Sequence, residues 1–200
     1  MNHIDQPALS PKQLRANMLA KRDSLPETTR AELSKHIIHN LKSISSYSKA
    51  KLPLFYISFR SEVNTWPLIK ERLAANLPVA APISLISKRE LDIRLIKNWD
   101  TDLHVGAYGI LEPVLETTQP VNPTDIDLVL VPGSVFGYNC GRYGYGGGFY
   151  DRFLSQKASQ AFRIGLSYEI QLAQSLALQP HDQKMDMIVT EKQIISCSSS

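Results

Sequence analysis

Residues 127–154 read DLVLVPGSVFGYNCGRYGYGGGFYDRFL, and the rest of the chain is organised around this stretch. Leucine and valine at 128–131 predict a buried β-strand, and Pro132 ends it because proline cannot donate a hydrogen bond to a sheet. Five of the eight residues at 141–148 are glycine, and residues 149–154 predict the start of a helix. A strand, a glycine-rich loop and a helix in this order predict a phosphate-binding loop, because converging N–H groups and a helix N-terminus attract anions.

The spacing of the glycines matches neither standard nucleotide-binding motif. It would put Phe149 where the dinucleotide fingerprint has its third glycine, and no Gly-Lys-Ser/Thr of a P-loop is present. A wide hairpin-like connection or Ω-loop without a ligand is therefore the alternative interpretation. Two features favour a ligand. Arg142 and Arg152 flank the loop and could each donate hydrogen bonds to a phosphate. Asp151 offers a hard oxygen ligand suited to Mg²⁺.

The chain has 200 residues, of which 43% are hydrophobic. Its net charge is +3 and its pI is near 8.8. This predicts a single domain over 1–200, with flexible ends at 1–9 and 196–200. The mild basicity suits a polyanionic small molecule and is too weak to indicate nucleic acid. With only Cys140 and Cys197 present, we expect no disulfide framework and a reducing compartment. The absence of a signal peptide and of a long apolar run predicts a soluble, cytoplasmic protein with no membrane partner.

Other segments predict the fold class. Strands expected at 51–59 and 77–83 enclose a helix at 64–76, which forms a right-handed βαβ unit with parallel strands. We therefore predict an α/β fold with an open, mostly parallel sheet, helices on both faces and an antiparallel edge. The remaining expected elements are helices at 10–22, 24–43 and 169–178, and strands at 91–96, 162–168, 187–190 and 193–195.

Polar residues stand beside several of these strands. Ligands of open α/β sheets bind beyond the carboxyl ends of the strands, where the strand order reverses. Glu62 follows the first strand and the glycine loop follows the central one. Asp182 precedes its strand and would reach the same edge only if that strand ran antiparallel at the edge of the sheet. Without a ligand, Glu62 would be a solvent-facing loop acid and Asp182 a cap or turn residue.

Four segments, taken together, resemble the 5-formyltetrahydrofolate cyclo-ligase family, also called methenyltetrahydrofolate synthetase. They are SFRSEVNTWPLI at 58–69, GILEP at 109–113, GRYGYGGGFYDRFL at 141–154 and HDQKMDMIVTE at 181–191. The resemblance implies an enzyme that uses ATP and Mg²⁺ to convert 5-formyltetrahydrofolate to 5,10-methenyltetrahydrofolate, releasing ADP and phosphate. Phosphorylation of the formyl oxygen would let N10 close the ring, a reaction that needs positioning and charge neutralisation more than a protein nucleophile.

The resemblance also implies residue roles. Arg142, Tyr150 and Asp151 would be catalytic, and Asp151 and Asp182 would hold Mg²⁺. The residues implied in ATP binding are Lys12, Arg15, Arg142, Tyr143, Gly144, Tyr145, Gly146, Gly147, Gly148, Phe149 and Tyr150. Those implied in folate binding are Ile57, Glu62, Tyr108, Tyr145, Gly146, Gly147, Gly148 and Phe149. Glu62 would accept hydrogen bonds from the pteridine N–H groups, and the ring of Tyr108 would stack on the pterin.

The chain departs from the family pattern at two places. Relatives usually carry Lys-x-x-x-Arg in the first helix; here Arg15 fits, but Pro11 occupies the lysine position and Lys12 follows one residue late. A shift of one residue turns a side chain by about 100° around a helix, and the long stem of Lys12 is expected to compensate. Tyr145 occupies a position that is often basic or apolar in relatives.

Two other functions fit part of the pattern. Another ATP-dependent phosphotransferase would use the same loop, and a single-stranded RNA-binding module would use the mixture of glycine and aromatic residues. Tracts of the second kind repeat and lie outside folded domains, whereas this chain has one copy between a strand and a helix. The expected partner is a folate, with a polyglutamate tail that the mild positive charge would favour, and the expected state is a monomer.

Overall fold

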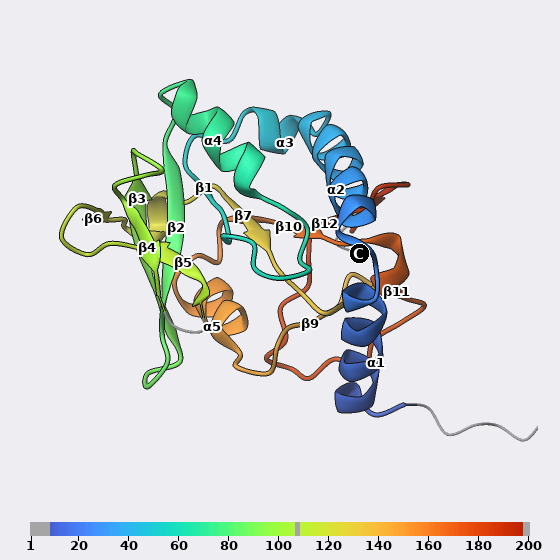
Figure 1. Ribbon diagram of the computed structural model, residues 1–200. Helices are drawn as coiled ribbons and strands as arrows, with labels where there is room; N and C mark the ends of the chain where they lie inside the picture. Colours follow the sequence, from blue (N-terminus) through green and yellow to red (C-terminus); the bar gives the residue numbers. More distant parts are fainter. Residues whose placement is uncertain (1–8, 107–108, 198–200) are drawn as a thin grey trace, which may run out of the picture.

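The computed structural model describes residues 9–106 and 109–197 (Figure 1). The strands of the main sheet are β1 (Pro53–Leu54), β2 (Val79–Leu85), β3 (Glu90–Ile96), β6 (Gln119–Pro120), β7 (Leu128–Val131), β10 (Phe162–Leu166), β12 (Met187–Val189) and β13 (Ile194–Ser196). Within the described residues these eight strands lie in the order β13-β12-β10-β7-β1-β2-β3-β6. The five from β12 to β2 are parallel, and antiparallel strands lie at both ends. The predicted α/β class with a mostly parallel sheet is confirmed.

Helices and two small sheets complete the fold. The helices are α1 (Pro11–Asp23), α2 (Glu27–Lys42), α3 (Ser45–Ser48), α4 (Trp66–Ala74) and α5 (Phe149–Gln156), with 3-10 turns η2 (Pro123–Asp125) and η3 (Glu169–Gln171). The small sheets pair β4 (Leu103–Val105) with β5 (Leu111–Pro113), and β8 (Val135–Gly137) with β9 (Arg142–Tyr143) and β11 (Leu172–Ala173). Ser10 caps α1, because its hydroxyl accepts the Gln13 N–H while the Gln13 side chain accepts the Ser10 N–H.

Helices cover both faces of the sheet, and the alternation along β7 shows why. Leu128 and Leu130 face the core formed with α2, α3 and α4, whereas Val129 and Val131 face the core formed with α5. Successive side chains of a strand point to opposite faces, so an unbroken apolar run belongs to a strand that is buried on both sides. All four residues are at most 1% exposed.

The chain order of the parallel strands creates a reversal point. From β1 the chain passes through α4 to β2 on one side, and later returns to β7 on the other side of β1. Loops that leave neighbouring carboxyl ends in opposite directions open a crevice between them. The functional site is therefore expected beyond the ends of β1 and β7.

The prediction of a helix at 169–178 is wrong. Only the short turn η3 forms there, and β11 then pairs with β8. The Gln171 side chain donates to the carbonyls of Gly133 and Ser134, and the Tyr138 N–H donates to Ala173. These contacts with a hairpin distant in sequence outweigh the local helix propensity.

The structure also contradicts the expectation of no disulfide, because Cys140 and Cys197 form one. Cys140 lies in the turn between β8 and β9, where its carbonyl accepts the Met185 N–H. Cys197 follows β13, whose pairing with β12 brings it beside the same segment. The two Cα atoms are 5.8 Å apart, within the range for a disulfide. Ser196 belongs to β13 and Cys197 is cross-linked, so these two residues are held at the edge of the sheet.

Among the described helices, none combines the length and the apolar character needed to cross a membrane.

Candidate active site

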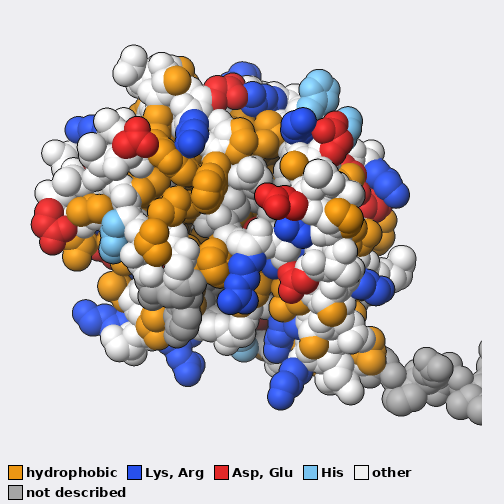
Figure 2. All heavy atoms as spheres, viewed as in Figure 1, with side chains coloured by type: hydrophobic (Ala, Val, Ile, Leu, Met, Phe, Trp, Pro, Cys, Tyr) orange, Lys and Arg blue, Asp and Glu red, His pale blue; other side chains and the backbone are white. Residues whose placement is uncertain are grey.

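A cavity of about 590 Å³ opens beyond the carboxyl ends of β1, β2 and β7. Its volume is typical of a small-molecule site. Ile57 and Glu62 come from the segment after β1, Pro82 and Ser84 from β2, and Pro132 directly follows β7. Figure 2 shows hydrophobic side chains gathered on this face over the region of β2 and β5, and charged side chains around α1. The cavity thus lies at the reversal point of the strand order.

The glycine loop forms one wall of this cavity. It does not follow β7 directly, because the hairpin of β8 and β9 lies between them, and the loop proper is residues 144–148. Gly148 precedes α5 with φ 66°, a conformation that costs glycine little, and no side chain caps the helix there. The first N–H groups of α5 and the positive end of its dipole are therefore available to an anion.

Arg142 and Asp151 form a buried ion pair in the same wall. Arg142 is 3% exposed, and its Nη2 donates to Asp151 Oδ2 at 2.9 Å while its Nη1 donates to the Pro132 carbonyl at 3.1 Å. The other oxygen of Asp151 accepts the Gln183 N–H at 3.1 Å. The Nε of Arg142 is buried and has no partner among the described residues. This pair connects β9, the first turn of α5 and the segment before β12.

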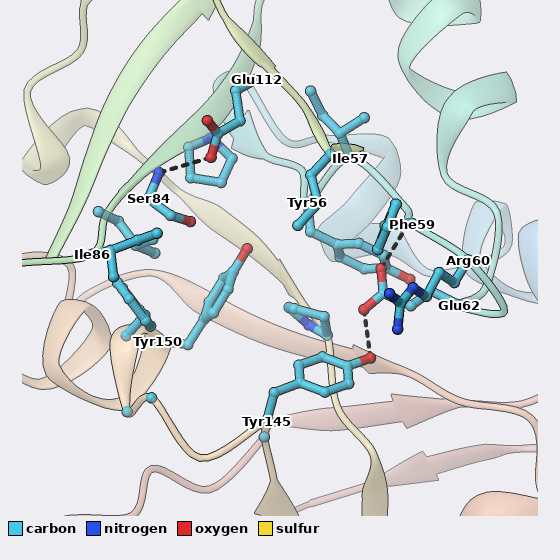
Figure 3. Close-up of a pocket in the computed structure, with 18 of the residues that line it drawn as sticks. Tyr56, Ile57, Phe59, Arg60, Glu62, Ser84, Ile86, Glu112, Tyr145 and Tyr150 are labelled. Atoms are coloured by element: carbon cyan, nitrogen blue, oxygen red, sulfur yellow. Dashed lines mark hydrogen bonds between the residues drawn. The ribbon is translucent and has the colours of Figure 1, made fainter. Parts of the chain in front are cut away.

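Tyr150 points its hydroxyl into the cavity, between Ser84 and Tyr56 (Figure 3). Within the described ranges this hydroxyl has no hydrogen-bond partner, and burial, followed by the charge of Glu62, raises the pKa of Tyr150 above its ordinary value. The phenol therefore stays protonated at neutral pH. It is a hydrogen-bond donor available to a ligand.

Glu62 lies on the facing wall. Its carboxylate accepts the Phe59 N–H at 2.9 Å and the Tyr145 hydroxyl at 2.5 Å (Figure 3). Burial raises the pKa of Glu62, and the hydrogen bonds from Tyr145 and Phe59 and the charge of Arg22 oppose that increase. A carboxylate in such a place suits the N–H groups of a heterocyclic ligand.

The structure brings many of the predicted site residues together. The lining includes, from the predicted set, Ile57, Glu62, Arg142, Gly144, Tyr145, Gly147, Gly148, Phe149, Tyr150 and Asp151. Tyr143 and Gly146 belong to the same segment without lining the cavity. Tyr108 lies outside the described residues.

The two basic residues predicted in α1 lie outside the cavity. The Arg15 guanidinium is 5.8 Å from the centre of the Tyr143 ring, next to Arg142 in the chain. Lys12 is exposed and makes no hydrogen bond or ion pair within the described part of the chain. The nucleotide contacts of both residues remain predictions.

Asp182 does not line the cavity, although the segment that carries it passes close to Asp151 by a route that was not predicted. An antiparallel strand was thought to be required, but β12 runs parallel to β10. The segment before β12 instead passes along α5, so that Gln183, the next residue, donates to Asp151. Asp182 itself accepts the Gln179 N–H at 2.7 Å. No group of three or more His, Cys, Asp or Glu side chains within 9–106 and 109–197 is arranged to hold a metal ion.

Sequence reasoning missed four charged residues of the cavity, Arg22, Asp23, Arg60 and Glu112. Arg22 follows Arg15 by seven residues, two helical turns, so its place on the same face of α1 was a usable signal. Glu112 lies in the GILEP segment, and its carboxylate accepts the Ser84 N–H at 3.3 Å across from Glu62 (Figure 3). No local pattern indicated that Glu112 would face inward.

Comparison with known proteins gives matches over most of the chain. The sequence model of the 5-formyltetrahydrofolate cyclo-ligase family matches residues 8–191. The 5-formyltetrahydrofolate cyclo-ligase of Haemophilus influenzae is 26% identical over 172 residues, covering 86% of this chain and 92% of the relative.

Two solved structures are also similar. The NMR structure of Aquifex aeolicus 5,10-methenyltetrahydrofolate synthetase has a TM-score of 0.83 at 32% identity, covering 96% of this chain and 95% of that one. A 5,10-methenyltetrahydrofolate synthetase from Mycoplasma pneumoniae has a TM-score of 0.72 at 26% identity, covering 92% and 99% of the two chains.

Proposed function

The chain belongs to the 5-formyltetrahydrofolate cyclo-ligase family, and we propose on that basis that it converts 5-formyltetrahydrofolate to 5,10-methenyltetrahydrofolate. One observation carries the proposal. Residues suited to a pterin, Ile57 and Glu62, share a single cavity with residues suited to phosphate, Arg142 and the loop 144–148. A folate and a polyphosphate bound on these two sides would meet at Tyr150.

We propose that ATP and Mg²⁺ bind on the phosphate side of the cavity. The uncapped start of α5, the loop amides and Arg142, with its unpartnered Nε, would hold the phosphates. Asp151 and Asp182 would hold Mg²⁺, which usually binds one or two carboxylates together with phosphate oxygens and water. When bound, these groups would supply the phosphoryl transfer that makes the formyl oxygen a leaving group.

The residues of the chain would bind and orient the folate. Glu62 would accept hydrogen bonds from the pteridine N–H groups, while the apolar side chains of Ile57 and Pro82 would enclose the ring. The Tyr150 hydroxyl would donate to the formyl oxygen and hold it toward the loop 144–148. With the formyl carbon fixed in this way, N10 of the same molecule would bond to it and lose its proton, while the formyl C–O bond would break and the oxygen would leave as phosphate. A single copy of the chain supplies all these residues, so we also propose that a monomer suffices.

The two alternative functions, RNA binding and phosphoryl transfer to another acceptor, are less well supported. An RNA-binding tract would present its aromatic rings to solvent, whereas Phe149 and Tyr150 line the cavity and only Tyr145 of these three is strongly exposed, at 51%. A phosphotransferase with another acceptor would not need a half-buried carboxylate such as Glu62 opposite the loop.

The direct test is an absorbance assay of the methenyl product with purified protein, ATP, Mg²⁺ and 5-formyltetrahydrofolate. We expect product formation that requires all three additions. Absence of product at ample folate and metal would refute the proposal. ATP turnover with an unrelated acceptor would indicate the phosphotransferase, and tight, salt-sensitive RNA binding would indicate the third function.

Replacement of Tyr150 by phenylalanine tests its part in the reaction. We expect kcat to fall about 100-fold, because a donor at a developing negative charge is removed. The free energy of unfolding should change by less than about 0.5 kcal/mol, since the hydroxyl has no partner to lose in the described protein. Steady-state kinetics and urea unfolding measure the two effects. Tyr47→Phe, a buried tyrosine outside the cavity, is the control and should leave kcat unchanged.

A further inference from the structure

Arg22 is a buried cation that faces the cavity, and it belongs to none of the four segments that resemble the family. It lies near the end of α1, is 4% exposed, and lines the cavity together with Tyr145 and Glu62. A charged group is rarely buried to this degree unless it is paired. The partners of Arg22 therefore indicate its role.

The direct partners of Arg22 are neutral. Its Nε donates to the Ser61 hydroxyl at 2.9 Å, and its Nη1 donates to the Tyr145 hydroxyl at 2.9 Å and to the Gly133 carbonyl at 3.5 Å. No carboxylate of the described residues lies within ion-pair distance of Arg22. Its charge must therefore be compensated through an intermediate group.

Two hydroxyls serve as intermediates: Ser61, which donates to Asp23, and Tyr145, which donates to Glu62 in the cavity. An arginine can only donate, so the phenol oxygen accepts from Arg22 and gives its single proton to Glu62 Oε1, 2.5 Å away. The result is a directed chain from a guanidinium through a phenol to a carboxylate, with the charge of Arg22 at one end and that of Glu62 at the other. Hydrogen bonds in such a chain strengthen one another.

We propose that Arg22 is a positioning residue for the folate: through the Tyr145 hydroxyl it keeps the Glu62 carboxylate ionised and directed into the cavity. This inference rests on the proposed function in that Glu62 is taken to meet the pteridine. It extends that function, because a residue of α1 then controls recognition of the ring by the opposite side of the cavity.

The groups around Glu62 leave Arg22 as the cation connected to it. The titratable or charged groups that face it are Arg22 and Asp23 from α1, Tyr56 from the segment after β1, Arg60 from its own loop, Tyr145 from the glycine loop and Tyr150 from α5. Asp23 accepts the hydroxyl of Ser61, which itself accepts from Arg22, so Asp23 is a second acid linked to Arg22. Arg60 stacks on Phe59, 5.0 Å from the ring centre, and makes no hydrogen bond to Glu62.

The pKa directions agree with this geometry. Burial raises the pKa of Glu62, whereas Tyr145, Phe59 and Arg22 lower it. Removal of Arg22 or of the Tyr145 hydroxyl should therefore raise that pKa further. A protonated Glu62 no longer accepts two N–H donors, so folate binding should weaken as the pH falls through the pKa of Glu62 and should do so at a higher pH in the variants.

Arg22→Gln, Arg22→Lys and Tyr145→Phe test the proposal with two readouts. The first is titration of the Glu62 carboxyl carbon by NMR, assigned with Glu62→Gln. The second is the pH profile of KM for folate and of kcat. We expect Arg22→Gln to move the Glu62 titration up by about one pH unit and to raise KM about tenfold at pH values below that pKa, with kcat at saturating folate within about twofold.

The other variants should shift the Glu62 titration by smaller amounts. Tyr145→Phe should shift the titration in the same direction by less, because the charge of Arg22 remains, and Arg22→Lys should recover part of the shift. Arg72→Gln is the matched control, since Arg72 is a buried arginine that donates only to backbone carbonyls away from the cavity. It should change neither readout.

Two results would overturn the proposal: a Glu62 titration that is unchanged in both Arg22→Gln and Tyr145→Phe, or a fall in kcat with an unchanged KM for folate, which would assign Arg22 to the reacting groups. If Arg22→Gln does not fold, Tyr145→Phe decides alone, because Tyr145 is half-exposed on a loop. Wild-type protein without turnover would refute the proposed function, while the NMR titration would still decide the link between Arg22 and Glu62.

Discussion

Asp151→Asn is expected to lower kcat by about 100-fold to 1000-fold while the protein stays folded. Asp151 accepts from Arg142 on one oxygen and from the Gln183 N–H on the other. Asparagine has nearly the same shape but loses the charge and one acceptor, so it would be a poor ligand for Mg²⁺ and a poor partner for Arg142. Steady-state kinetics should also show that more Mg²⁺, by about tenfold or more, is needed for half-maximal activity.

Asp186→Asn is the control variant that distinguishes a loss of catalysis from a loss of stability. Asp186 accepts the Arg163 N–H at 2.7 Å at the opposite end of β10, outside the cavity. Asp186→Asn should lose about 1–3 kcal/mol of stability, but its kcat should stay within about twofold of wild type. If Asp151→Asn loses its cooperative unfolding transition, or if both variants retain activity, Asp151 is a structural helix residue rather than a metal ligand.

Arg142→Gln is expected to have a comparable effect on activity and a larger effect on stability. The guanidinium is almost fully buried and connects the Pro132 carbonyl to Asp151. Its loss leaves a carboxylate without a counter-charge, which typically costs about 3–5 kcal/mol. We also expect kcat/KM for ATP to fall about 100-fold or more, because the fork that would hold phosphate is lost. Urea unfolding and initial rates measure the two effects.

Two further variants show whether the pair acts as a unit. Arg142→Lys keeps the charge but not the planar fork, so it should restore stability more than activity. The Arg142→Gln, Asp151→Asn double variant should lose less unfolding free energy than the two single variants lose together. Each single change leaves the other residue of the pair without its partner, and the double change does not. Strict additivity would show that the two residues act independently, and the ion pair would then have no special role in the site.

Part of this protein could be predicted from local sequence signals. The apolar run of β7 indicated a strand, and the glycines at 144–148 indicated a loop that leads into a helix. Glu62 was placed correctly beyond β1 because the carboxyl ends of parallel strands share one edge of the sheet. These features depend on residue periodicity and on glycine and proline, whose effects extend over only a few neighbouring residues.

Other features were decided only by tertiary structure. The segment 169–178 has a helical pattern but pairs with β8, the Gln183 N–H donates to Asp151, and Cys140 meets Cys197 across a sequence separation of 57 residues. The spacing from Arg15 gave the face of α1 on which Arg22 lies, but only its contacts with Ser61 and Tyr145 bury Arg22, while Lys12 stays exposed. Each of these outcomes depends on contacts between residues far apart in the chain. Such contacts form only when the packed sheet brings the segments together, so no local pattern encodes them.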